Sequence, residues 1–125
     1  MQSPAYFVGL DLAWGERKPT GVAVVDEDGQ LVHLSTATDD DSILAALAPF
    51  TGGDTVAGID APLIVTNPTG NRPGEAALNR DFRAFEAGAH PSNTGKPEFA
   101  ETPRGARVAA ALDLDLDPRS SRMRR

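Results

Sequence analysis

Two aspartates stand out because each is the only charged residue in an apolar run that otherwise has the composition of a buried strand. Asp11 lies in "VGLDLAWG", residues 8–15, and Asp60 lies in the similar stretch "VAGIDAPL", residues 56–63. A carboxylate removed from water needs hydrogen bonds, a cationic partner or a metal ion, because an uncompensated buried charge is strongly unfavourable. Oxygen ligands of this kind suit Mg²⁺ and Mn²⁺. The pattern therefore predicts a divalent-metal site if the fold brings the two aspartates together.

The residues around Asp11 predict an antiparallel meander of three strands. The apolar run over 6–13 is expected to form the first strand, and "GVAVVD" over 21–26 the second. The sequence Asp26-Glu27-Asp28-Gly29 between the second and third strands is typical of a tight turn, because Gly29 can adopt a positive φ. The third strand is expected over 30–36, at an edge of the sheet.

Asp60 is expected on a fourth strand that returns to lie beside the first. "TDDDS" predicts a helix N-terminus, with a short helix over 42–50. The apolar run over 55–61 then predicts a strand that is buried on both faces. A right-handed crossover can place this strand parallel to the first. Asp11 and Asp60 would then lie on strands about 4.8 Å apart, close enough to share a proton or a cation.

The second half of the chain predicts two further helices and a long loop. The breakers in "NPTGNRPG" precede a helix over 73–87, and a last helical pattern covers 103–114. Irregular loops as long as the one between these helices are usually functional or disordered. The first of the two helices has an apolar stripe at helical spacing, which predicts a core-facing surface formed by Leu78, Phe82, Phe85 and Ala89.

Composition limits the class of protein. A chain of 125 residues, 40% of them hydrophobic, is the size of one domain. The absence of Cys excludes disulfides, thiolate zinc sites and a Cys nucleophile, and fits a reducing cytoplasm. No apolar run approaches the roughly 18 residues of a membrane helix, and the N-terminus lacks the charged region of a signal peptide. We therefore predict a cytoplasmic protein without a membrane partner.

Charge gives little support for tight binding to nucleic acid. The net charge of −6 repels phosphate backbones unless the charges are segregated or a divalent metal intervenes. The basic residues of "PRSSRMRR" do form a segregated cluster, and 115–125 is expected to be a basic tail. A solvated, frayed end is the simpler interpretation of this tail, and a nucleic-acid-binding arm is the alternative.

The motifs together resemble a known family. "VGLDLAWGERKPTGVAVVD", "VAGIDAPL", "NPTGNRPGEAALNRDFR" and "GAHPSN" resemble, in this order and spacing, the DUF429 family of predicted ribonuclease H-like nucleases. The resemblance covers about residues 7–119. It implies an α/β ribonuclease H-like mixed sheet, with three antiparallel strands followed by a parallel fourth.

The resemblance also implies a metal-dependent nuclease and the roles of its site residues. Asp11 and Asp60 would hold the divalent ions, Mg²⁺ or Mn²⁺, of a two-metal phosphodiester hydrolysis. Arg72 and Glu75 match an "R..E" pattern of the family, with Glu75 as a further catalytic acid and Arg72 as a phosphate ligand. His90 and Asn93 fall in the shared "HPSN" loop and would contact substrate, which is nucleic acid or another phosphodiester.

The chain is shorter than the family pattern. Family members continue with further strands and a late acidic residue, so 1–125 is expected to be the N-terminal part of a single ribonuclease H-like domain whose C-terminal half is missing. Such a fragment could be inactive. Its fourth strand would be an open edge, which could pair with a second copy or with a complementing chain.

Each site residue also has a simpler structural interpretation. Asp11 and Asp60 could cap loops at strand ends, and Glu75 could be an acidic first-turn residue that interacts with the helix dipole. Arg72 could form a salt bridge with Glu75, and His90 could stabilise its loop by a hydrogen bond. His33 is expected to face solvent on an edge strand, and Trp14 to pack in the core or against a loop.

Two other classes of function remain open. The turn after Asp11 resembles the first phosphate loop of actin, Hsp70 and sugar-kinase ATPases, but Leu12, Ala13 and Trp14 stand where small or hydroxyl residues are usual. Saturable ATP binding would support this alternative. The other alternative is a non-catalytic module that pairs through its open sheet edge, which a strictly monomeric protein would contradict.

Overall fold

The computed structural model describes residues 5–117 and 119–120, and within it the chain forms two compact units. The first unit, here the sheet unit, comprises residues 1–61 and 107–125, and the second, here the loop unit, comprises 62–106. The expected basic tail over 115–125 lies partly outside the described residues. Among the helices that the structure describes, none has the length and apolar composition needed to span a membrane.

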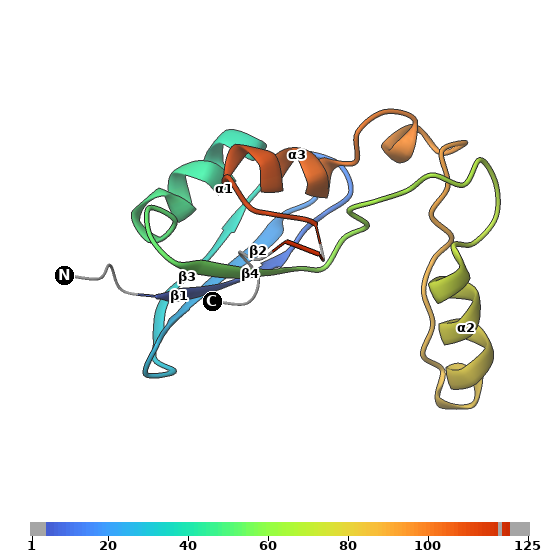
Figure 1. Ribbon diagram of the computed structural model, residues 1–125, viewed down its shortest axis with the longest axis horizontal. Coiled ribbons are helices and arrows are strands. Elements are labelled where there is room, and N and C mark those ends of the chain that lie inside the picture. The colour runs from blue at the N-terminus through green and yellow to red at the C-terminus, as the bar shows by residue number, and fades with distance from the viewer. Residues whose placement is uncertain (1–4, 118, 121–125) are drawn as a thin grey trace. The chain divides into compact units, whose positions relative to one another are not determined.

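The sheet unit contains the expected mixed sheet of four strands. These are β1 (Tyr6–Asp11), β2 (Thr20–Asp26), β3 (Leu31–Ala37) and β4 (Thr55–Ile59), in the order β3-β2-β1-β4 (Figure 1). β1 pairs antiparallel with β2, and β2 with β3, whereas β4 is parallel to β1. The prediction of an antiparallel meander followed by a parallel fourth strand is confirmed.

Local chemistry explains the turn between β2 and β3. Gly29 has a φ of +79°, and its N–H donates to the Asp26 carbonyl at 3.0 Å. The Asp26 carboxylate accepts hydrogen bonds from the N–H groups of Asp28 and Gln30, both at 2.9 Å. A short acidic side chain and a glycine therefore close the hairpin, as the sequence predicts.

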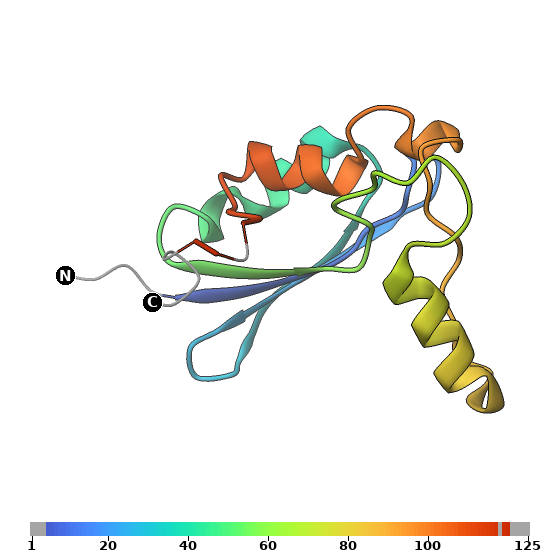
Figure 2. The ribbon, with the colours of Figure 1, turned by 45° about the vertical axis from the view of Figure 1, so that its right-hand side comes forward.

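One face of the sheet is covered by α1 (Asp40–Leu47) and α3 (Arg104–Ala111), as Figure 2 shows. The Asp39 carboxylate caps α1 by accepting from the Ser42 N–H at 2.7 Å, and a 3₁₀ turn over Ala48–Phe50 extends the helix. The helices and the sheet share one hydrophobic core. Its buried members are Val8, Leu10, Leu12, Val22, Val24, Ala37, Ile43, Leu47, Val108 and Leu112.

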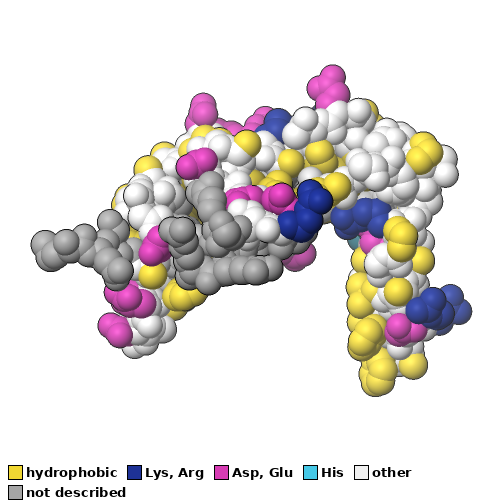
Figure 3. All heavy atoms as spheres, viewed as in Figure 1, with side chains coloured by type: hydrophobic (Ala, Val, Ile, Leu, Met, Phe, Trp, Pro, Cys, Tyr) yellow, Lys and Arg dark blue, Asp and Glu magenta, His cyan; other side chains and the backbone are white. Residues whose placement is uncertain are grey.

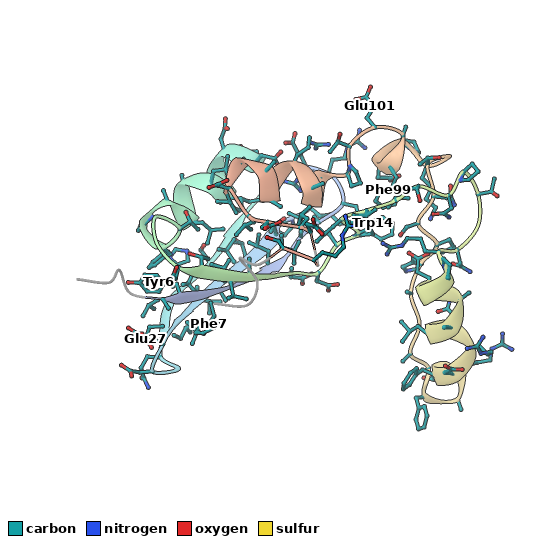
Figure 4. All side chains as sticks on the ribbon, in the orientation of Figure 1. Tyr6, Phe7, Trp14, Glu27, Phe99 and Glu101 are labelled. Carbon is teal, nitrogen blue, oxygen red and sulfur yellow. The ribbon has the colours of Figure 1, made fainter. Side chains whose placement is uncertain are left out.

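The opposite face of the sheet, here the open face, is exposed within the described chain. Val56 on β4 is 61% exposed and Phe7 on β1 is 48% exposed, and both alternate with residues that face the core. Figure 4 shows Phe7 on the side of the strands away from the helices. The prediction that the fourth strand is buried on both faces is therefore wrong for the described residues.

His33 does not face solvent as expected. It alternates with Leu34, which is 71% exposed, and therefore lies on the covered face of the sheet. Its ring centroid is 5.7 Å from that of Phe50, and its Nε2 lies 2.7 Å from the Ser35 hydroxyl. The ring of Phe50 also contacts Tyr6 edge-on at 5.2 Å. His33 thus belongs to a small aromatic cluster under the helix layer.

The loop unit is built around α2 (Pro73–Phe82), which a 3₁₀ turn over Arg83–Phe85 follows. A second 3₁₀ turn covers Pro97–Phe99. The expected core stripe on α2 is exposed instead: Phe85 is 75% exposed and Phe82 is 47% exposed. Figure 3 shows hydrophobic side chains gathered on the surface of α2 and of the turn that follows it. The stripe has helical periodicity, but no described residue of the loop unit buries it, so the prediction of a core surface is wrong.

Candidate functional site

The parallel pairing of β1 and β4 places Asp11 and Asp60 side by side. The strands are in register from Tyr6 opposite Thr55 to Leu10 opposite Ile59, and each aspartate is the next residue along its strand. The Asp60 N–H donates to the Leu10 carbonyl at 2.8 Å, which continues the ladder up to the two aspartates. Neighbouring strands lie about 4.8 Å apart, so the two carboxylates are close enough to act on one ligand.

Both aspartates lie on the open face. Asp11 lies between the buried Leu10 and Leu12, and Asp60 lies between Ile59 and Ala61, which pack against the core. Side chains alternate along a strand, so both carboxylates point away from the helices. Both residues are exposed, which corrects the expectation of a charge in an apolar environment. Water can therefore screen their repulsion, and an ion from solution can reach them.

The two aspartates border a shallow groove of about 590 Å³. Its floor consists of small residues on three strands, and Leu34 on β3 forms its opposite side. The small residues are Gly9, Gly21, Ala23 and Gly58. The pair of carboxylates therefore borders an uncharged groove floor on the open face of the sheet.

Two residues that the sequence analysis did not single out shape the surroundings of Asp11. Thr20 is fully buried, and its hydroxyl accepts a hydrogen bond from the Ala13 N–H at 3.1 Å, which holds the chain just after Asp11. Gly21 lies opposite Asp11, and a Cβ placed there would be 3.5 Å from the Asp11 Cβ. The pairing register was the signal that could have identified both residues.

The donor set suits a divalent cation that keeps part of its water shell. Mg²⁺ is commonly held by one or two carboxylates, with waters and substrate phosphates completing its octahedron. Asp11 and Asp60 supply two carboxylates in adjacent positions. Within residues 5–117 and 119–120, no group of three or more acidic, His or Cys side chains is arranged to hold a metal. The residues therefore fit one ion with two protein ligands.

Glu75 and Arg72 are brought together in the loop unit, at the start of α2. The Arg72 Nε donates to Glu75 Oε1 at 2.9 Å, and the Arg72 backbone N–H donates to Oε2 at 2.8 Å. The Ser92 N–H donates to the same Oε2 at 3.0 Å. Glu75 is only 5% exposed. Its carboxylate thus joins the start of α2 to the loop that contains Ser92.

These contacts set the ionisation of Glu75. Burial raises the pKa of this carboxyl, but hydrogen bonds from Ser92 and Arg72 outweigh that effect and lower the pKa from 4.5 to about 2. A group with so low a pKa stays ionised at neutral pH and is a poor proton donor. The local geometry supports a structural role for Glu75, which holds the start of α2 against the loop that contains Ser92. The catalytic role of Glu75 stays a prediction.

Asn93 also makes local contacts in the loop unit. Its Nδ2 donates to the Gly70 carbonyl at 3.1 Å, and its Oδ1 accepts from the Gly95 N–H at 3.1 Å. Asn67, which the sequence analysis did not single out, donates from Nδ2 to the Ser92 carbonyl at 3.0 Å. These bonds connect the loop before α2 to the "HPSN" loop.

Arg72 and His90 retain accessible side chains. The Arg72 side chain is 33% exposed, although its Nη1 donates to the Ile64 carbonyl at 3.1 Å, and His90 is exposed. Arg72, Glu75, His90 and Asn93 belong to the loop unit, whereas Asp11 and Asp60 belong to the sheet unit. Their substrate-binding roles stay predictions.

Comparison with known proteins identifies one family. A family model described as "Protein of unknown function (DUF429)" matches residues 9–125, which is almost the whole chain. The match begins within β1 and includes Asp11 and Asp60. It also includes α2, which carries Glu75, and the loop that contains Ser92. The comparison with curated proteins finds no match.

Proposed function

The chain belongs to the DUF429 family, and we propose that it is a divalent-metal-dependent phosphodiester hydrolase with Asp11 and Asp60 as the metal ligands. The observation that carries the proposal is the parallel register of β1 and β4, which sets the two carboxylates on adjacent strands and on one exposed face. Exposed like charges on neighbouring strands repel one another, and a cation offsets that repulsion. The preferred cofactor is Mg²⁺ or Mn²⁺.

The chain's own residues would position the ion and leave room for the substrate. When bound, a divalent ion polarises a phosphoryl oxygen and lowers the pKa of a coordinated water. The strand ladder fixes the backbone of Asp11 and Asp60, so the positions from which their side chains extend are set. The Ala13–Thr20 hydrogen bond restrains the chain beyond Asp11. Gly21 leaves the space beside the Asp11 side chain open.

Two accessible side chains of the loop unit are the candidates for contacts with a phosphodiester. Arg72 and His90 are suited to contact a phosphate, because a guanidinium forms paired hydrogen bonds and an imidazole can carry a proton. Asn93 could instead support these residues by holding its loop. The absence of Cys is compatible with function in the cytoplasm, where we place the protein.

The test is Mn²⁺-dependent cleavage of bis(p-nitrophenyl) phosphate by the wild type and by Asp11→Asn and Asp60→Asn variants. We expect either substitution to abolish cleavage, since each removes a charged ligand while keeping side-chain size. Asp28→Asn is the matched control, because Asp28 is an exposed aspartate of the β2–β3 turn. Cleavage by the Asp11 and Asp60 variants at the wild-type rate would refute the proposal.

A second candidate function is self-association through the sheet. β4 is the last strand of the described sheet, and Val56 on its open face is 61% exposed. Unpaired strand edges and exposed apolar faces favour association between chains. Light scattering that gives a dimer for the wild type and a monomer for Val56→Lys would support this function. A monomer at all concentrations would exclude it.

A further inference from the structure

The open face of the sheet has a graded composition that the proposed metal site does not explain. Its rows run across the strands, and the row that contains Asp11 and Asp60 lies at one end. The next row along places Gly9 of β1 between Gly58 of β4 and Ala23 of β2. The third row contains Phe7 of β1 opposite Val56 of β4. From the carboxylates inward, the surface therefore changes from acidic to small and then to apolar.

Among the described residues, no contact or backbone conformation requires the glycines of the second row. A Cβ added to Gly9 meets nothing within 4 Å, and one added to Gly58 meets only the Val8 carbonyl oxygen at 4.0 Å. Neither glycine has a positive φ, since only Gly29 and Gly70 do among the described glycines. Glycine weakens the interior of a strand, and it often marks a place where a ligand approaches the backbone closely.

The groove formed by these glycines has the volume of a small-ligand site. Its volume of about 590 Å³ is within the usual range for such sites. Peptide groups without side chains form a flat floor, which suits a planar ring. Rows two residues apart are separated by about 6.7 Å, so a ring on Gly9 and Gly58 would lie one row from the carboxylates. Phe7, 48% exposed, offers an aromatic contact beyond the ring.

The charge that lines the groove favours a short ligand over a long polyanion. Proteins that bind extended single strands line a groove with positive charge to follow the phosphate backbone. The groove here is lined by two acidic side chains and no basic ones. A single phosphodiester on the metal ion, with one base beside it, matches these charges.

We propose that the glycine-floored groove holds a nucleobase of a mononucleotide- or dinucleotide-sized phosphodiester whose phosphate faces Asp11 and Asp60. This inference rests on the proposed function, because the two carboxylates need a cation in order to receive a phosphate. It specifies the substrate class of that site as a small nucleotide rather than a nucleic-acid duplex or long strand. Gly9, Gly58 and Phe7 are then specificity-determining residues.

The test measures binding with Ca²⁺ present, by the NMR shifts of the Gly9 and Gly58 amides. The probes are the dinucleotide thymidylyl-thymidine, dimethyl phosphate, which lacks a base, and a thymidine 20-mer. Burial of one face of the base on the groove floor is expected to make the dinucleotide bind at least about fivefold more tightly than dimethyl phosphate. Gly9→Val, read out at Gly58, should remove this difference by filling the groove. Gly52→Val is the control, because its added Cβ also meets nothing within 4 Å.

The outcomes separate this inference from the proposed function. Quenching of Trp14 fluorescence by Mn²⁺ reports binding of the ion independently of the nucleotide. Trp14 is the only Trp in the chain and lies three residues after Asp11. Equal binding of dinucleotide and dimethyl phosphate, with quenching intact, would overturn the inference alone. Tenfold or greater preference for the 20-mer, per binding site, would also overturn it. Loss of the dinucleotide preference in Gly9→Val, with quenching retained, is the result that we expect.

Discussion

The strongest quantitative prediction concerns Glu75, whose carboxylate joins the start of α2 to the loop containing Ser92. Glu75→Gln keeps the size of the side chain but removes its charge. The amide of Gln also places a donor where the carboxylate oxygens accept from the N–H groups of Arg72 and Ser92. We therefore expect the variant to destabilise the loop unit at neutral pH.

The magnitude follows from the ionisation of Glu75. A pKa that falls from 4.5 to about 2 on folding corresponds to about 3 kcal/mol of stability at neutral pH. Because the folded-state pKa of Glu75 is the lower one, this contribution is complete above pH 4.5 and is lost as the pH falls toward 2. About 2 of the 3 kcal/mol should be lost by pH 3. The stability difference between wild type and variant should shrink accordingly.

The assay is urea unfolding at several pH values, followed by the NMR signal of the Ser92 amide, together with titration of the Glu75 carboxyl carbon. Glu98→Gln is the matched control, since Glu98 is an exposed acid of the same unit and should change stability by less than about 0.5 kcal/mol. A Glu75 carboxyl that titrates near 4.5, or a variant as stable as wild type at pH 7, would refute the reasoning.

Substitutions at three further positions test the packing and the cap of α1. Ile43→Ala should cost about 2–5 kcal/mol in urea unfolding followed by Trp14 fluorescence, because Ile43 is fully buried in the core; a loss under 1 kcal/mol would contradict the core assignment. Phe85→Ser should change the free energy of unfolding by less than about 0.5 kcal/mol, since Phe85 is 75% exposed. A large loss of stability, measured by circular dichroism, would mean that Phe85 is buried after all. Asp39→Ala should lower the free energy of unfolding by about 1 kcal/mol, because it removes the cap on α1. Asp39→Ser should retain most of the stabilisation that the cap provides.

The sheet was predictable from the sequence because its signals are local or follow from few topological choices. The meander of β1, β2 and β3, the Asp26–Gly29 turn and the Asp39 cap each depend on residues close together in the chain. The crossover rule then places β4 beside β1, so the adjacency of Asp11 and Asp60 follows. The site's two carboxylates are thus a consequence of topology and register.

Burial was less predictable, because a pattern shows which face is apolar but not what covers it. The stripe containing Phe82 and Phe85 has helical spacing, yet these side chains are exposed. The run over 55–61 is apolar on both faces, yet Val56 is exposed. The Ser92–Glu75 hydrogen bond joins residues 17 positions apart, and no local signal indicates such a contact.

The glycines show what the register adds to the sequence. Gly9 and Gly58 each stand two positions before the aspartate in the two similar stretches, but the sequence alone does not show that they form the floor of a groove. In the sheet they lie opposite one another, next to the carboxylates, in a groove that a side chain would fill. The repeated sequence pattern thus places both the metal ligands and the groove floor in adjacent rows.

The central claim is that Asp11 and Asp60 bind one divalent cation together, and paramagnetic broadening by Mn²⁺ tests it most directly. Substoichiometric Mn²⁺ should broaden the amide signals of Leu12, Gly21 and Ala61 first, and should spare Gly29 at the far end of β2. Either Asp11→Asn or Asp60→Asn should abolish this selective broadening, and Asp28→Asn should leave it intact. Uniform broadening over the acidic surface, or selective broadening that survives both substitutions, would contradict the claim.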